Sequence, residues 1–225
     1  MIRSVDNPWT TRWSLRGCVE MENHVEMDYF DESKCVTALE RQVAITELLR
    51  VITAALKSAD VDYWLDSGSL LGQIRAQSVI PWDNDADIGV TTAGYEYLRD
   101  HELPVPEGFV LNIYDSRLHP EGTRDWIIPG RLVDTRFGFY VDIFVFHETR
   151  VNGIAMLAVT PSACWNTCHK CVRVGKYDGF FVIPKSYVYP LISCPFADFT
   201  VLCPAKRTSY LDHIYGPDYL IEKRY

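Results

Sequence analysis

The feature that most constrains the fold of this 225-residue chain is the apolar run from Phe137 to Phe146, FGFYVDIFVF. Polar residues do not alternate with apolar ones in it, so a strand formed here is apolar on both faces. Such a strand is stable where other layers cover both of its faces. The run therefore predicts a strand at the centre of a sheet.

Patterns on either side of this run indicate a mixed α/β domain. From Ser33 to about Ser58 apolar residues recur every three to five positions, which is typical of an amphipathic helix capped by Asp31 or Ser33. A hairpin return is expected after Asn152-Gly153. Further expected elements are strands at 61–65, 82–90, 109–113 and 126–128, and helices at 70–77, 91–101 and 209–215. From the hairpin to about residue 204 we expect loop-rich decoration.

Composition and charge exclude several classes of protein. Hydrophobic residues make up 48% of the chain and aromatic residues 13%, which is enough for a sizeable core. Thirty acidic against 22 basic residues give a net charge of -8, and this disfavours nucleic acid, which binds basic faces. We expect no transmembrane segment, because the chain has no run of about 18 apolar residues. The N-terminus also lacks the apolar core of a signal peptide.

Asp83, Asp85 and Asp87 alternate along the chain, so on a strand their side chains leave the same face. Three carboxylates on one face repel one another unless a cation lies among them. Carboxylate oxygens suit Mg²⁺ or Mn²⁺, which also bind water and substrate phosphates. The alternative is a solvated acidic edge or turn.

Asp142 lies inside the apolar run, where an ionised carboxylate without a partner costs several kcal/mol. One interpretation is a buried ion pair with Arg131 or Arg136. The other is a third ligand to the cation of Asp85 and Asp87.

Gly68-Ser69 follows an expected strand and begins an expected helix. Free backbone N–H groups at such a helix start bind anions, Gly68 admits a close approach, and Ser69 adds a hydroxyl donor. Arg75 is a candidate bidentate donor to the same phosphate. The alternatives are an ordinary turn and a surface arginine.

These parts together resemble a known family. The segment YWLDSGSLLGQIRAQSVIPWDNDADIGV, residues 63–90, closely resembles the signature of the LicD family, the group that includes fukutin and fukutin-related protein. The resemblance recurs at residues 138–144 and weakly at Tyr210-Leu211, Tyr215-Gly216 and Tyr219. It implies a nucleotidyltransferase-type α/β fold with a mixed sheet, and a domain at 31–225 after an N-terminal extension at 1–30.

The resemblance also implies an activity: metal-dependent transfer of a phosphorylated alcohol, such as phosphocholine or ribitol phosphate, from a CDP-linked donor to a glycan hydroxyl. Asp85, Asp87 and Asp142 would hold Mg²⁺ or Mn²⁺, and Gly68 and Ser69 would hold donor phosphate. Arg75 and Asp83 match family positions for substrate binding. Asn84 departs from the pattern, since many relatives carry a further Asp there.

Two rival functions keep the same fold. One is nucleotidyl transfer to a small acceptor, and the other is a catalytically inactive protein that binds glycans or nucleotides. The three intact carboxylates favour an enzyme. The expected compartment is the Golgi or secretory lumen for a eukaryotic chain and the cytoplasm otherwise.

Five of the seven cysteines fall within 40 residues, at Cys164, Cys168, Cys171, Cys194 and Cys203. With His169 they offer ligands enough for a structural Zn²⁺. A disulfide between Cys194 and Cys203 is the second interpretation, and free thiols are the third. Cys18 and Cys35 give no further indication.

Overall fold

The computed structural model describes residues 17–19, 24–31, 33–160, 171–174 and 177–221, and its centre is an eight-stranded mixed sheet. Its main part has the strand order β1-β2-β5-β4-β3. The bounds are β1 Tyr63–Leu65, β2 Ala86–Thr91, β3 Phe109–Ile113, β4 Gly130–Asp134 and β5 Tyr140–Val151. The α/β fold class with a mixed sheet is thereby confirmed.

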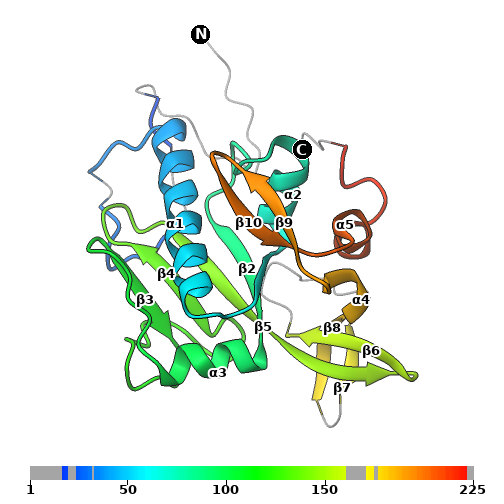
Figure 1. Cartoon of the computed structure of the whole chain (residues 1–225). Helices are drawn as coiled ribbons and strands as arrows, with labels where there is room; N and C mark the ends of the chain where they lie inside the picture. Colours follow the sequence, from blue (N-terminus) through cyan, green and yellow to red (C-terminus); the bar gives the residue numbers. More distant parts are fainter. Residues whose placement is uncertain (1–16, 20–23, 32, 161–170, 175–176, 222–225) are drawn as a thin grey trace.

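Strand β5 is the central strand that the apolar run predicts. Its first half pairs parallel with β2 and antiparallel with β4, and residues 139–146 are buried. Its second half, from His147, pairs with β6 (Ile154–Val159) across the turn at Asn152-Gly153. One long strand therefore joins the main sheet to the β6-β8-β7 extension, which projects at the lower right of Figure 1.

The C-terminal third has more regular structure than its sequence suggests. Its elements are β7 (Cys171–Val174), β8 (Tyr177–Pro184), α4 (Lys185–Val188), β9 (Ile192–Phe196), β10 (Phe199–Cys203) and α5 (Arg207–Tyr215). The β9-β10 hairpin was not expected, because Pro195 lies inside β9 and proline argues against a strand. A two-stranded sheet tolerates this proline, since both of its strands are edges.

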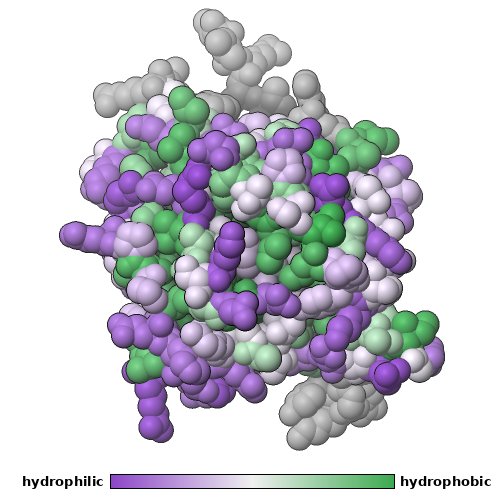
Figure 2. All heavy atoms as spheres, in the orientation of Figure 1, coloured by the Kyte–Doolittle hydropathy of each residue, from purple (hydrophilic) through white to green (hydrophobic). Residues whose placement is uncertain are grey.

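Helix α1 (Ala38–Ser58) lies across the sheet, while α2 (Ser67–Ala76) and α3 (Thr92–Asp100) lie near opposite ends of β2 (Figure 1). Leu48, Ile52 and Leu56 are fully buried on the inner side of α1. The face shown in Figure 2 intersperses hydrophilic and hydrophobic residues, as expected for a solvated surface. No helix in the described part of the chain has both the length and the apolar character needed to cross a bilayer.

The expected caps of α1 are wrong. The helix begins at Ala38 and its N-cap is Thr37, whose side chain accepts from the Glu40 N–H while the Glu40 carboxylate accepts from the Thr37 N–H. This reciprocal capping box satisfies two N–H groups that Asp31 or Ser33 cannot reach. Asp31 and Ser33 instead bond to each other in a separate turn.

Thr37→Ala should lower the free energy of unfolding by about 1 kcal/mol, since it removes the side-chain half of the capping box. Ser33→Ala is the matched control and should change it by no more than about 0.5 kcal/mol, because Ser33 is exposed and outside the helix. Urea unfolding followed by circular dichroism measures both. A larger loss for the Ser33 variant would show that the cap is misassigned.

Candidate active site

Three carboxylates that lie far apart in the sequence converge at the start of β2. One oxygen from each of Asp85, Asp87 and Asp142 lies within 4.8 Å of the others. The parallel register places Asp87 directly opposite Asp142, and Asp85 is the residue before β2. The parallel pairing thus brings together aspartates that lie more than 50 residues apart in the sequence, as expected for these three residues.

The electrostatics of this group favour a cation. Desolvation raises the pKa of Asp87 well above its usual value, and the charges of Asp85 and Asp142 raise it further. Desolvation also raises the pKa of Asp142. Three oxygen donors at this spacing are the donor set that hard divalent cations take, so the residues present fit such an ion.

Asp142 forms one of the two contacts that the sequence left open, the ion pair with Arg131, and its place as a third cation ligand stays a prediction. Arg131 donates through Nε to Asp142 Oδ1 (2.6 Å) and through Nη2 to Oδ2 (3.0 Å). The ion pair is therefore real, yet the carboxylate remains in the group of three. Each carboxylate oxygen has two lone pairs, so a bidentate arginine leaves room for a cation. Arg136 pairs instead with Asp134 and Glu47.

The expectation of one strand over 82–90 that carries all three acids is wrong, because Asp83 and Asp85 both precede the strand and only Asp87 lies on it. Strand β2 begins only at Ala86, and the preceding turn is held by the buried Arg41, which donates to Asn84 Oδ1 (2.7 Å) and the Pro81 carbonyl (2.7 Å). These bonds connect α1 to the segment before β2.

Gly68 allows a close approach of the Asp83 carboxylate. A Cβ at Gly68 would lie 3.0 Å from Asp83 Oδ2, closer than side chains ordinarily pack. Desolvation and the charge of Asp85 raise the pKa of Asp83 to about 7. The start of α2 and the acidic turn therefore lie against each other beside the group of three.

Ser69 and Arg75 have structural partners. The Ser69 hydroxyl accepts from the Asp87 N–H (2.9 Å) and so joins α2 to β2. Arg75 Nη2 donates to the Tyr219 carbonyl (2.6 Å), which ties α2 to the C-terminal end of the described chain. Their contacts with donor phosphate remain predictions.

Sequence reasoning missed His24 and Glu26, which come from the segment assigned to an N-terminal extension. His24 Nδ1 lies 3.3 Å from Asp85 Oδ2, and this contact raises the pKa of His24. Glu26 Oε1 accepts from Arg131 Nη1 (2.5 Å). Neither residue belongs to a local motif, so spacing gave no signal for them.

The family follows from the comparison with known proteins. Residues 60–206, about two thirds of the chain, match the family described as LicD/FKTN/FKRP, nucleotidyltransferase domain. The chain belongs to the LicD family. The resemblance of residues 63–90 is thereby confirmed.

Curated relatives of this LicD chain include two named transferases. Human ribitol 5-phosphate transferase FKRP is 26% identical over 192 residues, which cover 81% of this chain and 33% of that protein. Mouse ribitol-5-phosphate transferase FKTN is 25% identical over 209 residues, 91% of this chain and 39% of that protein. An uncharacterised protein of Rickettsia prowazekii is 36% identical over 50 residues, 22% of this chain and 19% of that protein. The chain spans little more than a third of the length of the named transferases.

A fourth carboxylate of the LicD signature, Asp66, is fully buried beside the start of α2. Its Oδ1 accepts from the Tyr210 hydroxyl (2.7 Å) and the Ser67 N–H (2.8 Å). The Trp64 indole N–H lies 3.3 Å from the same Tyr210 oxygen. This explains why the resemblance recurs at Tyr210, since α5 closes over the signature from the other end of the chain.

Cysteines outside the LicD signature form cross-links. Disulfides join Cys18 to Cys35 and Cys194 to Cys203, and Cys171 is disulfide-bonded as well. Oxidised sulfurs are not thiolate ligands, so these cysteines favour the disulfide interpretation over structural zinc. Cys164, Cys168 and His169 lie outside the described residues.

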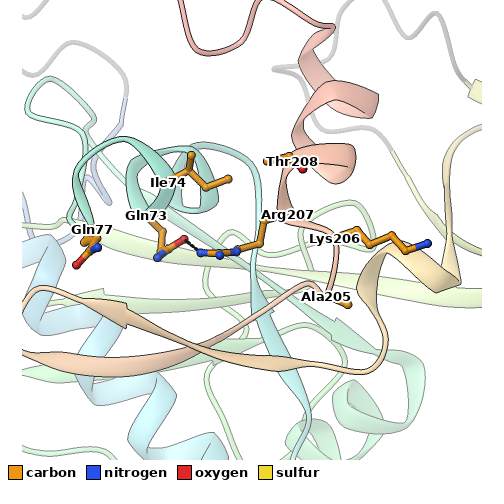
Figure 3. A pocket seen from close by; sticks show the side chains of 7 residues that line it. All are labelled: Gln73, Ile74, Gln77, Ala205, Lys206, Arg207 and Thr208. Atoms are coloured by element: carbon orange, nitrogen blue, oxygen red, sulfur yellow. Dashed lines mark hydrogen bonds between the residues drawn. The ribbon is translucent and has the colours of Figure 1, made fainter.

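A cavity of about 300 Å³ lies between the second half of α2 and the start of α5 (Figure 3). Arg207 Nη1 donates to Gln73 Oε1 (2.9 Å) across it, while Lys206 points away from this pair. The residues that line it come from α2 and from 205–208, and the carboxylates of the LicD site are not among them. The cavity therefore does not define the candidate active site.

The burial of Asp66 predicts a pH effect on stability. Desolvation raises its pKa from 3.8 to about 6, so between these values the folded state keeps a proton that the unfolded state has lost. The contribution of Asp66 to the free energy of unfolding is therefore greatest below about pH 4, and it falls by about 3 kcal/mol as the pH rises through 6. Asp66→Asn should remove that fall. Urea unfolding between pH 4 and pH 7 measures this change in the free energy of unfolding. Asp212→Asn, on the exposed side of α5, is the control. Equal pH dependence in the Asp66 variant and the wild type would contradict the raised pKa.

Proposed function

We propose that this chain transfers a phosphorylated alcohol, such as phosphocholine or ribitol phosphate, from a CDP-linked donor to a glycan hydroxyl, with the help of Mg²⁺ or Mn²⁺. The observation that carries the proposal is the convergence of Asp85, Asp87 and Asp142 within 4.8 Å beside the start of α2. The FKRP and FKTN relatives are both named ribitol 5-phosphate transferases, which supports the same class of reaction.

In this reaction the acceptor oxygen attacks the phosphorus that carries the alcohol. A P–O bond forms, the anhydride P–O bond breaks, and CMP leaves with the bridging oxygen while the acceptor proton passes to the medium. Asp85, Asp87 and Asp142 would hold the cation. Bound there, the cation would supply charge neutralisation for the donor diphosphate.

The chain's own groups would position the donor beside this cation. The backbone N–H groups of Gly68 and Ser69 lie in the first turn of α2 and have no acceptor within the helix, so they are available to bind a phosphate. Arg131 keeps the Asp142 carboxylate oriented through two parallel hydrogen bonds. Ser69 fixes the backbone of Asp87, so the phosphate site and the cation site share one rigid connection.

The disulfides support a compartment for this activity. Cys18–Cys35 and Cys194–Cys203 persist in oxidising surroundings and are reduced in a cytosol. We therefore place the proposed activity in a secretory lumen or another oxidising compartment.

Asp85→Asn and Asp87→Asn should each reduce turnover by at least about 100-fold, because each removes a negative charge from the cation site without changing side-chain size. Purified protein is incubated with CDP-linked alcohols, glycan acceptors and Mn²⁺, and the release of CMP is measured. Asp212→Asn serves as the control and should retain wild-type turnover.

The products distinguish the rival functions. Attack at the other phosphorus of the donor would attach the nucleotide to the acceptor and release the phosphorylated alcohol, which indicates nucleotidyl transfer. A folded wild-type protein that binds donor without forming any product would support the inactive binding protein. Near-normal turnover in either Asn variant would refute the proposed cation site.

A further inference from the structure

Four charged side chains form a closed network behind the candidate cation site. Arg131 contacts both Asp142 and Glu26, and Arg124 does the same, with Nη2 2.9 Å from Glu26 Oε1 and Nη1 3.5 Å from Asp142 Oδ1. All four side chains are 10% exposed or less. Water therefore screens these charges poorly, and they must balance one another.

The network is neutral only if Glu26 is included. Arginine stays protonated under all ordinary conditions, so Arg124 and Arg131 bring two positive charges. Asp142 supplies one negative charge, and it is also one of the three carboxylates of the candidate cation site. Glu26 supplies the second negative charge. Without it, a buried excess of +1 would lie directly behind a carboxylate that the cation needs.

Glu26 is held in place by its own backbone as well as by its carboxylate. Its N–H donates to the Gly138 carbonyl (2.8 Å), and a Cβ at Gly138 would lie 2.8 Å from the Glu26 carbonyl oxygen. The Cys18–Cys35 disulfide closes the loop that carries Glu26. The loop is thus fastened to Gly138, the second residue of the central apolar run.

We infer that Glu26 is a positioning residue of the cation site: it balances Arg124 and Arg131, so that Asp142 stays oriented toward the cation without a repelling positive charge behind it. This inference rests on the proposed function, because it assumes that Asp85, Asp87 and Asp142 bind a divalent cation. It adds to that site a residue from outside the matched part of the chain.

The test measures cation binding, independently of turnover. Mn²⁺ is titrated into full-length protein, and free Mn²⁺ is followed by electron paramagnetic resonance. Glu26→Gln should weaken Mn²⁺ binding about tenfold, as expected for one uncompensated charge at this range. Glu47→Gln is the matched control: it removes a carboxylate from the exposed pair with Arg136, and should leave the Kd unchanged.

A second substitution separates charge balance from a general loss of structure. Glu26→Gln combined with Arg124→Gln is neutral again, so the double variant should recover a Kd within about threefold of wild type. Arg124→Gln alone leaves an excess negative charge and should bind Mn²⁺ more tightly. This single variant also carries the test if Glu26→Gln does not fold.

Three results would overturn the inference. They are a wild-type Kd in folded Glu26→Gln, a double variant that stays as weak as Glu26→Gln, and an unchanged Kd in Arg124→Gln. If wild type binds Mn²⁺ and Asp87→Asn does not, these results leave the proposed function intact. Wild-type protein that binds no Mn²⁺ would overturn the proposed function and this inference with it.

Discussion

The parallel pairing of β2 with β5 is the constraint on which the rest of the structure depends. Its register sets Asp87 opposite Asp142, and the same ladder pairs Ile88 with Ile143 and Val90 with Val145. Those apolar residues are buried, so their burial fixes the register. A slip by one residue would send one carboxylate to the other face of the sheet. The hydrophobic core thus determines where the charges meet.

The charges around this pairing are arranged in two layers. In front, Asp85, Asp87 and Asp142 lie close enough to share one cation. Behind, Arg131 lies 3.5 Å from the centre of the Tyr140 ring and holds Asp142 with two hydrogen bonds. Like charges would not stay this close in a fold held by electrostatics alone. Here the sheet forces them together, and the arginines behind offset part of the repulsion.

Local pattern was enough to predict the central strand and most of the helix expected over 33–58, which begins at Ala38. The grouping of Asp142 with Asp85 and Asp87 was expected from the family resemblance, since local pattern left an ion pair equally open for Asp142. An apolar run that contains a single acidic residue indicates that the run is buried and that the acidic residue has a partner. The run does not indicate which partner: in the fold Asp142 pairs with Arg131 and also lies beside Asp85 and Asp87. The alternating aspartates predicted a strand that includes Asp83, and this was wrong. The segment around Asp83 has the same alternating pattern but is a turn bonded to Arg41. The contact of Glu26 with Arg131 spans 105 residues and follows no period, so only the folded chain reveals it.

Because a disulfide closes the loop that carries Glu26, the way the protein is prepared affects the surroundings of the candidate site. A thiol reductant added to protect cysteines during purification would open the Cys18–Cys35 link and leave the segment that carries His24 and Glu26 held only by hydrogen bonds and ion pairs. A fragment trimmed to residues 60–206 would keep all three aspartates and both arginines but leave a positive charge unbalanced behind them. If Glu26 positions the cation site as inferred, either preparation would contain residues 63–90 and Asp142 and still bind the cation poorly.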